Sequence, residues 1–172
     1  IGQSALSSEN AHGRNTAIGH QTLSTLDAGA NANNVAVGYH AGTLMTSGVQ
    51  NTIIGSESGD AITSGDDNTS LGYFSLSANT VGNNNIAIGV SALATNVASD
   101  RNVAIGNNAL NAMTSASTVD SYNTAIGHAA GSAITSGVQN TLIGANVGVR
   151  ITAGQKNTII GEGADVASGG AG

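Results

Sequence analysis

The sequence predicts an all-β protein, a parallel β-solenoid or β-roll of about ten rungs, each near 17 residues long. The main observation is that Asn-Thr-Ala-Ile-Gly at 15–19 recurs in close copies to the end of the chain. The closing glycines of these copies are separated by 17, 19, 17, 17, 17, 17, 21, 17 and 17 residues. The chain also shows no 3.6-residue hydrophobic period, which disfavours a helical repeat. A unit of this length leaves room for two short strands and two turns.

The repeats define one array over residues 1–165, followed by a Gly-rich irregular end over 166–172. The chain opens on the last two residues of a repeat and stops just before the next asparagine is due, so both ends resemble cuts from a longer chain. The rungs close at Gly2, Gly19, Gly38, Gly55, Gly72, Gly89, Gly106, Gly127, Gly144 and Gly161.

Composition narrows the function classes. Only 8% of residues are charged and 2% aromatic, and the net charge is −6 with no basic patch, which argues against nucleic-acid binding. No apolar run approaches the roughly 20 residues of a membrane span, so we expect no membrane insertion. The absence of cysteine excludes disulfides and cysteine metal sites. We expect no cofactor.

Counting from the repeat asparagine as position zero, each column of the array predicts a role. The asparagine recurs in every rung, which predicts a turn and a stacked amide ladder. The glycine at +4 predicts the turn that leaves the strand. The ladder comprises Asn15, Asn34, Asn51, Asn68, Asn85, Asn102, Asn123, Asn140 and Asn157.

Strand alternation assigns +1 and +3 to the interior and +2 to the outside. The predicted core column at +3 is always a large aliphatic: Ile18, Val37, Ile54, Leu71, Ile88, Ile105, Ile126, Ile143 and Ile160. The +2 column is never charged, which predicts that neighbouring subunits cover it. This predicted subunit interface comprises Ala17, Ala36, Ile53, Ser70, Ala87, Ala104, Ala125, Leu142 and Ile159.

The second half of the rung has two versions, with leucine or glycine at +8. After a leucine rung the next +2 residue is alanine, whereas after three of four glycine rungs it is Ile53, Leu142 or Ile159. Glycine rungs also carry a large apolar residue at +11, such as Ile62. We interpret this as packing compensation, in which two backbone variants aim one apolar side chain each into the same slot.

Chemistry-bearing residues are few. Asp66 and Asp100 share a column two rungs apart, about 10 Å, which is compatible with inverting glycoside hydrolysis, but Asn83 lies between them. The histidines His12, His20, His40 and His128 show no metal-ligand spacing. We therefore predict no catalytic and no metal-binding residues, and expect that the chain is not an enzyme.

Three further features bear on binding. The candidate receptor contacts are the aromatics Tyr39, Tyr73, Phe74 and Tyr122, because aromatic rings stack on sugars. Two rungs are expanded, by two residues before Asn34 and by four before Asn123, and such bulges tend to lie on a binding face. Threonine fills +1 in six of nine rungs and raises ice binding, although +1 is assigned to the interior.

The Asn-Thr-Ala-Ile-Gly and Gly-Tyr-x-Ala-Gly phrases resemble the repeats of phage tail-fibre shafts over residues 1–165. They are also similar to the Asn-x-Val-Ala-Ile-Gly repeats in the heads of trimeric autotransporter adhesins, which are left-handed parallel β-rolls with shorter rungs. The resemblance implies an intertwined or side-by-side homotrimer that acts as a stiff extracellular spacer in a virion tail fibre, with a host-surface glycan or protein as receptor. The alternative is the head of an adhesin or another filament on a bacterial surface, and polysaccharide depolymerase activity ranks with ice binding behind both.

Overall fold

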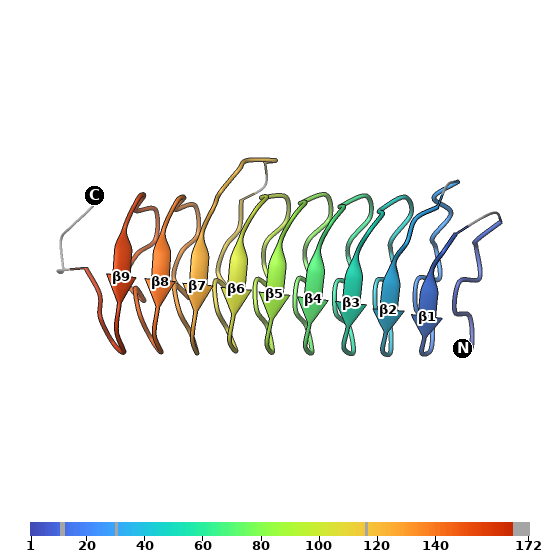
Figure 1. Ribbon diagram of the computed structural model, residues 1–172, viewed down its shortest axis with the longest axis horizontal. Helices are drawn as coiled ribbons and strands as arrows, with labels where there is room; N and C mark the ends of the chain where they lie inside the picture. The colour runs from blue at the N-terminus through green and yellow to red at the C-terminus, as the bar shows by residue number, and fades with distance from the viewer. Residues whose placement is uncertain (11–12, 30, 116, 167–172) are drawn as a thin grey trace.

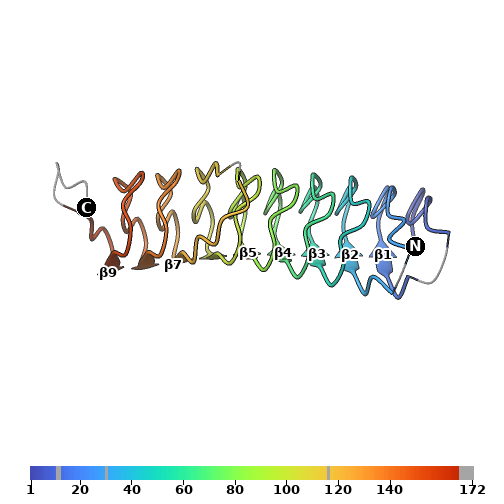
Figure 2. The same ribbon diagram turned by 90° about the horizontal axis from the view of Figure 1, so that it is seen from above.

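The computed structural model describes residues 1–10, 13–29, 31–115 and 117–166. These residues wind into an all-β parallel solenoid (Figure 1), in which each strand pairs with the next one along the chain to form one sheet. Figure 2 shows the strands along one long side of the molecule, with the rest of each rung looping away from them. The strands are β1 (Thr16–Ile18), β2 (Val35–Val37), β3 (Thr52–Ile54), β4 (Thr69–Leu71), β5 (Ile86–Ile88), β6 (Val103–Ile105), β7 (Thr124–Ile126), β8 (Thr141–Ile143) and β9 (Thr158–Ile160).

The fold class is confirmed, but the rungs differ from the predicted ones in two respects. The nine strands β1 to β9 delimit about eight complete turns rather than ten, because the ten closing glycines bound only nine intervals and no described strand precedes Gly2. Each described rung carries one three-residue strand instead of two. Residues 167–172 of the expected irregular end lie outside the described residues.

Left-handed backbone conformations close each rung and prevent a second strand. In the rungs that start at Asn34 to Asn140, the residues at +6, +8 and −1 have positive φ, as at Phe74, Leu76 and Asn84, with φ of 58°, 49° and 57°. Position +8 is left-handed whether it holds leucine or glycine, since φ is 52° at Gly59. The expectation of two backbone variants is therefore wrong, because one backbone accommodates both residues.

The glycine at +4 is required by a close approach between rungs. At Gly89, φ is 130°, and a Cβ there would lie 2.6 Å from the carbonyl carbon of Gly106 in the next rung. Real Cβ atoms do not approach backbone so closely, and side chains disfavour this φ. The recurrence of glycine at this column follows from stacking of one turn directly on the next.

The repeat asparagines lie inside the coil and form an amide ladder. The Oδ1 of Asn51 accepts the backbone N–H of Asn68 at 2.9 Å, and its Nδ2 donates to the carbonyl of Gly65 at 2.9 Å. Equivalent Oδ1 to N–H bonds join each of the nine asparagines to the next. The left-handed residue of this turn is the one before the asparagine, such as Gln50, and not the asparagine itself.

The assignment of the strand faces from the sequence is wrong. The +2 column, taken as the subunit interface, points into the coil, where Ala36, Ala87 and Ala104 are 0% exposed. The +3 column, taken as the core, faces outward, and Leu71 is 43% exposed. The remaining +3 residues are likewise half-exposed or exposed, and the remaining +2 residues are buried apart from half-buried Ile159.

The physical reason is that side chains from the opposite wall already fill the interior. Position +11 is buried in every described rung and holds Leu26, Met45, Ile62, Asn79, Asn96, Met113, Ile134 and Ile151. Leucines at +8 are buried beside them, as at Leu93. Little space remains beneath the strand, so alanine at +2 fits there while the larger +1 and +3 residues point outward.

The packing compensation between position +8 and position +2 of the next rung arises because the two side chains would occupy the same space inside the coil. A Cβ on Gly42 would lie 2.8 Å from Cδ2 of Leu23 and 3.2 Å from Cδ1 of Ile53. A Cβ on Gly131 would likewise lie 2.8 Å from Cδ1 of Leu142. The large +2 residue thus occupies the volume that glycine leaves vacant.

Three serines divide the interior into two apolar clusters. The cluster around Ile53 and Ile62 ends where the cluster around Leu76 begins. Between them the buried hydroxyls of Ser58, Ser70 and Ser75 bond to one another at 2.7–3.1 Å. Because each hydroxyl has a partner, this polar insertion is compatible with burial.

We expect Gly42→Leu to lower the free energy of unfolding by about 1–3 kcal/mol, because the new side chain overlaps Ile53. Combining it with Ile53→Ala recreates the leucine-rung packing and should recover part of that loss. Urea unfolding of both single variants and the double variant measures the coupling energy. Strictly additive losses would show that the two positions do not share one space.

Candidate functional site: the outward face and corners of the coil

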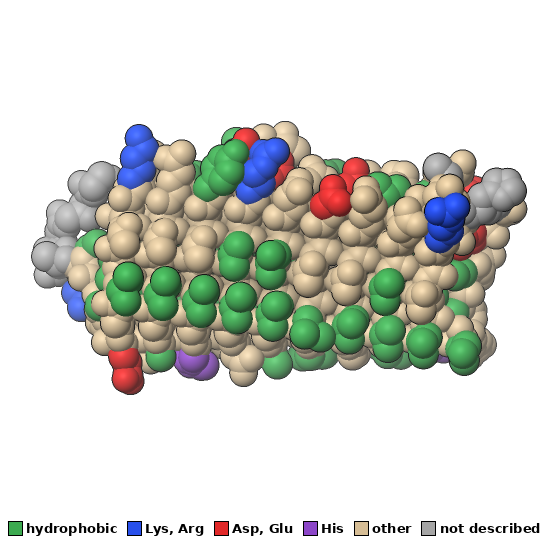
Figure 3. Space-filling view, viewed as in Figure 1, with side chains coloured by type: hydrophobic (Ala, Val, Ile, Leu, Met, Phe, Trp, Pro, Cys, Tyr) green, Lys and Arg blue, Asp and Glu red, His purple; other side chains and the backbone are tan. Residues whose placement is uncertain are grey.

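The outward sheet face, formed by the +1 and +3 residues of β1 to β9, is uncharged, with an aliphatic row at +3 and mostly threonine at +1. Figure 3 shows its hydrophobic side chains as a row along the length of the molecule, with charged side chains above and below it. Position +1 is Thr, Val or Ile and position +3 is Ile, Val or Leu, so the face carries no charge. Its exposed members include Ile18, Val35, Leu71, Ile86, Ile126 and Ile160, at 36–67% exposure.

A face of this size and polarity is unusual on an isolated soluble domain. Contiguous exposed apolar patches commonly mark surfaces that another molecule covers. The in-register pairing of the strands, such as Ile88 opposite Ile105, aligns the side chains in straight rows. The arrangement can therefore bury apolar area against a second flat surface, but it offers no nucleophile or acid–base pair.

The column of Asp66, Asn83 and Asp100 links neighbouring rungs. The Oδ1 of Asp66 accepts the backbone N–H of Val49 at 2.8 Å, and the Oδ1 of Asp100 accepts that of Asn83 at 2.6 Å. Asn83 continues the chain by accepting from the N–H of Asp66 at 2.8 Å. These carboxylates thus serve the backbone of the preceding rung, which is a structural use of the residues that the sequence placed in one column.

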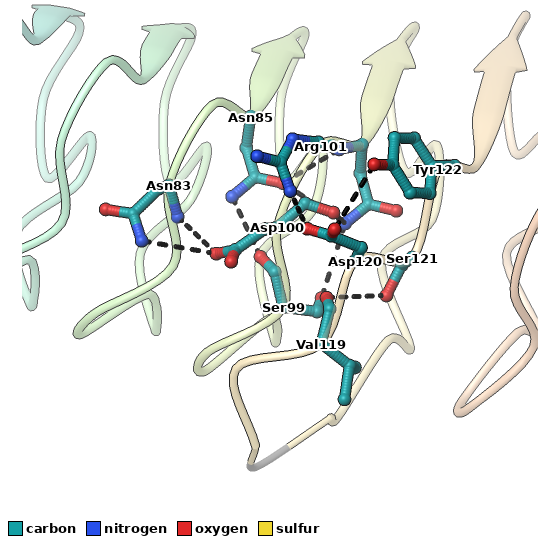
Figure 4. A network of polar contacts seen from close by, with 10 residues as sticks. Asn83, Asn85, Ser99, Asp100, Arg101, Val119, Asp120, Ser121 and Tyr122 are labelled. Carbon is teal, nitrogen blue, oxygen red and sulfur yellow. Dashed lines mark hydrogen bonds and ion pairs between the residues drawn. The ribbon is translucent and has the colours of Figure 1, made fainter.

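A network of polar contacts stabilises the larger expanded rung, which has four added residues before Asn123, where it rejoins the regular coil (Figure 4). Arg101 forms an ion pair with Asp120, and the hydroxyl of Tyr122 donates to Oδ2 of Asp120 at 3.2 Å. The guanidinium carbon of Arg101 lies 5.7 Å from the ring centroid of Tyr122. Because Arg101 and Asp120 are each nearly half exposed, the ion pair contributes at most about 1 kcal/mol. Tyr122, a candidate receptor contact, is engaged here in holding the loop.

Aromatic and imidazole rings gather at the turn that follows the first strands. His20 stacks on Tyr39 with centroids 5.4 Å apart, and Tyr39 stacks on His40 at 3.9 Å. Tyr73 and Phe74, two rungs further along, lie 5.1 Å apart and tilted. Positions +5 and +6 of successive rungs meet at this corner, where the ring centroids of His20 and His40 lie 5.7 Å apart.

Unpaired polar atoms accompany this stack. Nδ1 of His20, Nε2 of His40 and Oδ1 of Asp60 are buried and have no hydrogen-bond partner among the described residues. Within the described residues, no three His, Cys, Asp or Glu side chains are placed to hold a metal ion. His128 is exposed on a distant rung, and His12 lies outside the described residues.

Burial raises the pKa of Asp60 above its usual value of 3.8, and nearby Glu57 raises it further, while backbone hydrogen bonds and His40 act in the opposite direction. A carboxyl group whose pKa is raised on folding stabilises the folded state at pH values below the pKa that the group has in the unfolded chain. It loses that contribution as the pH rises through the folded pKa. Ionised Asp60 therefore destabilises the fold at neutral pH relative to acidic pH.

Asp60→Asn should accordingly stabilise the protein at pH 7, and the gain should shrink near about pH 4. Urea unfolding at both pH values measures the effect, with the exposed Asp67→Asn as the matched control. An Asp60→Asn variant that is less stable than the wild type at pH 7 would contradict this account of the carboxyl.

Comparison with known proteins returns no family model, no curated protein and no solved structure that matches the chain. The part of the chain that the structure describes contains no helix with the length and apolarity of a membrane span.

Proposed function

We propose that the chain is a stiff, self-associating segment of an extracellular fibre, most closely the shaft of a phage tail fibre. The observation that supports this is the uncharged outward sheet face, which extends over nine consecutive strands. Three copies that pack these faces against one another would bury the aliphatic rows and leave the charged edges in water. The three-fold arrangement follows from the resemblance of the repeats to fibre shafts and adhesin heads.

The coil itself suits a mechanical role. Each rung is hydrogen-bonded to the next around its circumference, for example by Thr52 to Asn68, Gly55 to Val37 and Thr63 to Thr80 at 2.8–2.9 Å. The interior amide ladder adds a continuous second set of bonds along the axis. Such a rod would hold host-binding parts away from a virion. The head of a bacterial surface adhesin is the alternative location for the same rod.

Analytical ultracentrifugation tests the proposal. At micromolar concentration we expect sedimentation equilibrium to give the mass of three chains and sedimentation velocity to give the frictional ratio of an elongated particle. A stable monomer under these conditions would contradict self-association through the sheet face.

One observation favours ice binding as a second candidate. The objection from the sequence was that +1 lies in the core, but +1 faces outward in the structure. Threonines at +1 therefore stand beside the aliphatic row in runs of neighbouring rungs about 4.8 Å apart, such as Thr52 with Thr69 and Thr141 with Thr158. The column is interrupted by Val35, Ile86 and Val103. The two proposals compete for one face. A monomer that shows thermal hysteresis would support ice binding, and an oligomer without it would support the fibre.

A further inference from the structure

The aromatic corner is a second surface feature that the fibre's rod shape does not explain. We define it as the side chains at positions +5, +6 and +9 of four successive rungs: His20, Tyr39, His40, Glu57, Asp60 and Tyr73. It lies at the ends of β1 to β4, along the edge of the sheet where the strands end. Three of the four Tyr and Phe residues of the whole chain, Tyr39, Tyr73 and Phe74, occur at this corner.

Folding does not require rings at these positions. In later rungs +5 holds Val90, Asn107 or Ala145, and +6 holds Ser91 or Ala129 with the same left-handed backbone. The rings are also not buried, because Tyr39 is 49% and Tyr73 51% exposed. Exposed aromatics that the fold does not need are typical of a binding surface.

The charges at the corner restrict its ligand. No Lys or Arg occurs between Arg14 and Arg101, whereas Glu57 and Asp60 lie within the corner itself. Phosphate, sulfate or carboxylate groups would therefore meet negative potential without a compensating cation. The ligand should be uncharged.

Polar groups at the corner restrict the ligand further. Nδ1 of His20, Nε2 of His40 and Oδ1 of Asp60 are buried, so a surface ligand meets instead the half-exposed side chains of Tyr39 and Tyr73. Each phenol group offers an apolar ring face and a hydroxyl group, which suits a ligand that carries both apolar ring surface and hydroxyl groups. Binding sites commonly combine aromatic surface with a few polar groups in this way.

The spacing of the rings indicates a chain rather than a single small molecule. Tyr39 and Tyr73 occupy the same column two rungs apart, about 10 Å, and the small Ser56 lies between them. This span exceeds one sugar ring. We propose that the aromatic corner binds an uncharged oligosaccharide through Tyr39 and Tyr73. The inference rests on the proposed function, since it supplies the attachment step of a surface-binding fibre.

The test uses the full chain and a Tyr39→Ala/Tyr73→Ala double variant. Alanine already occupies this column at Ala145, so the substitution suits the backbone. Tyr122→Ala is the matched control, because Tyr122 is also 49% exposed but lies on the expanded rung. The probes are immobilised cellohexaose, mannohexaose and N-acetylchitohexaose, with a heparin hexasaccharide as the anionic probe.

We expect wild type and Tyr122→Ala to bind at least one neutral probe, and the double variant to bind it at least about tenfold more weakly. No binding of any neutral probe, equal binding by the double variant, or tightest binding to the heparin probe would each overturn the inference. Light scattering on the same samples separates the two proposals. An intact oligomer that binds no neutral probe contradicts the inference alone, whereas a monomer contradicts the fibre.

Discussion

Replacing Leu71 and Ile126 with aspartate is expected to convert the assembled protein into folded monomers. Both side chains lie on the outward sheet face, at 43% and 37% exposure in the isolated chain. Burying an aliphatic side chain contributes about 1.5–3 kcal/mol, and the substitution also places a carboxylate in each copy at a shared apolar interface. Light scattering over a range of concentrations measures the dissociation, and circular dichroism shows whether the coil persists.

A matched variant separates the effect of position from the effect of charge. Ser64→Asp with Ser136→Asp adds the same two charges at exposed residues away from the sheet face, and we expect it to leave the oligomer intact. Dissociation by both pairs would indicate general charge repulsion. Unchanged oligomers of the Leu71 and Ile126 variant would show that another face mediates assembly.

Aspartate at the inward-facing central residue of a strand should have a different outcome. Ala87 is the central residue of β5, and its neighbours Ile86 and Ile88 face outward. Ala87 itself is 0% exposed and points into the coil. An aspartate at Ala87 would be a buried charge without a partner, so unfolding rather than clean dissociation is expected. The contrast with the outward-facing Leu71 and Ile126 tests which side of the strands faces the interior.

The second large effect is expected from Asn51→Leu in the amide ladder. Leucine is similar in size to asparagine but leaves the buried N–H of Asn68 and the carbonyl of Gly65 without their partners. Each orphaned group costs about 1–3 kcal/mol, so the free energy of unfolding should fall by about 2–6 kcal/mol. Urea unfolding provides the measurement.

Asn107→Leu is the control for this ladder prediction. Asn107 is exposed, and its side chain accepts only one hydrogen bond, from Val90 on the surface. Its replacement should change stability by no more than about 0.5 kcal/mol. If Asn51→Leu and Asn107→Leu had equally small effects, the ladder would not stabilise the coil as proposed.

The repeat length, the parallel coil and the compensation between +8 and +2 could be predicted from the sequence. They follow from local constraints that recur in every rung, such as the close approach at Gly89. The number of complete turns and the absence of a second strand in each rung could not be predicted. The reason is that the left-handed backbone of residues such as Leu76 cannot be recognised from the residue type.

The prediction of which strand face points into the coil was wrong for a different reason. Period-two alternation separates the two faces but does not say which one is inside, and large residues at +1 and +3 suggested a core. The overlooked signal was compensation itself, because Ile53 can replace what Gly42 lacks only if both lie in the interior. The sequence singled out Tyr39 and Tyr73 as candidate receptor contacts but did not indicate that His20 and His40 stack on Tyr39, since positions +5 and +6 meet only across successive rungs.

Site-specific cross-linking tests the role of the sheet face most directly. The sequence contains no cysteine, so Leu71→Cys introduces a single thiol on the outward sheet face and Ser64→Cys a single thiol elsewhere. Under mild oxidation at micromolar concentration, Leu71→Cys should form covalent dimers rapidly and Ser64→Cys should not. Rapid cross-linking through Ser64→Cys with none through Leu71→Cys would contradict assembly through the sheet face.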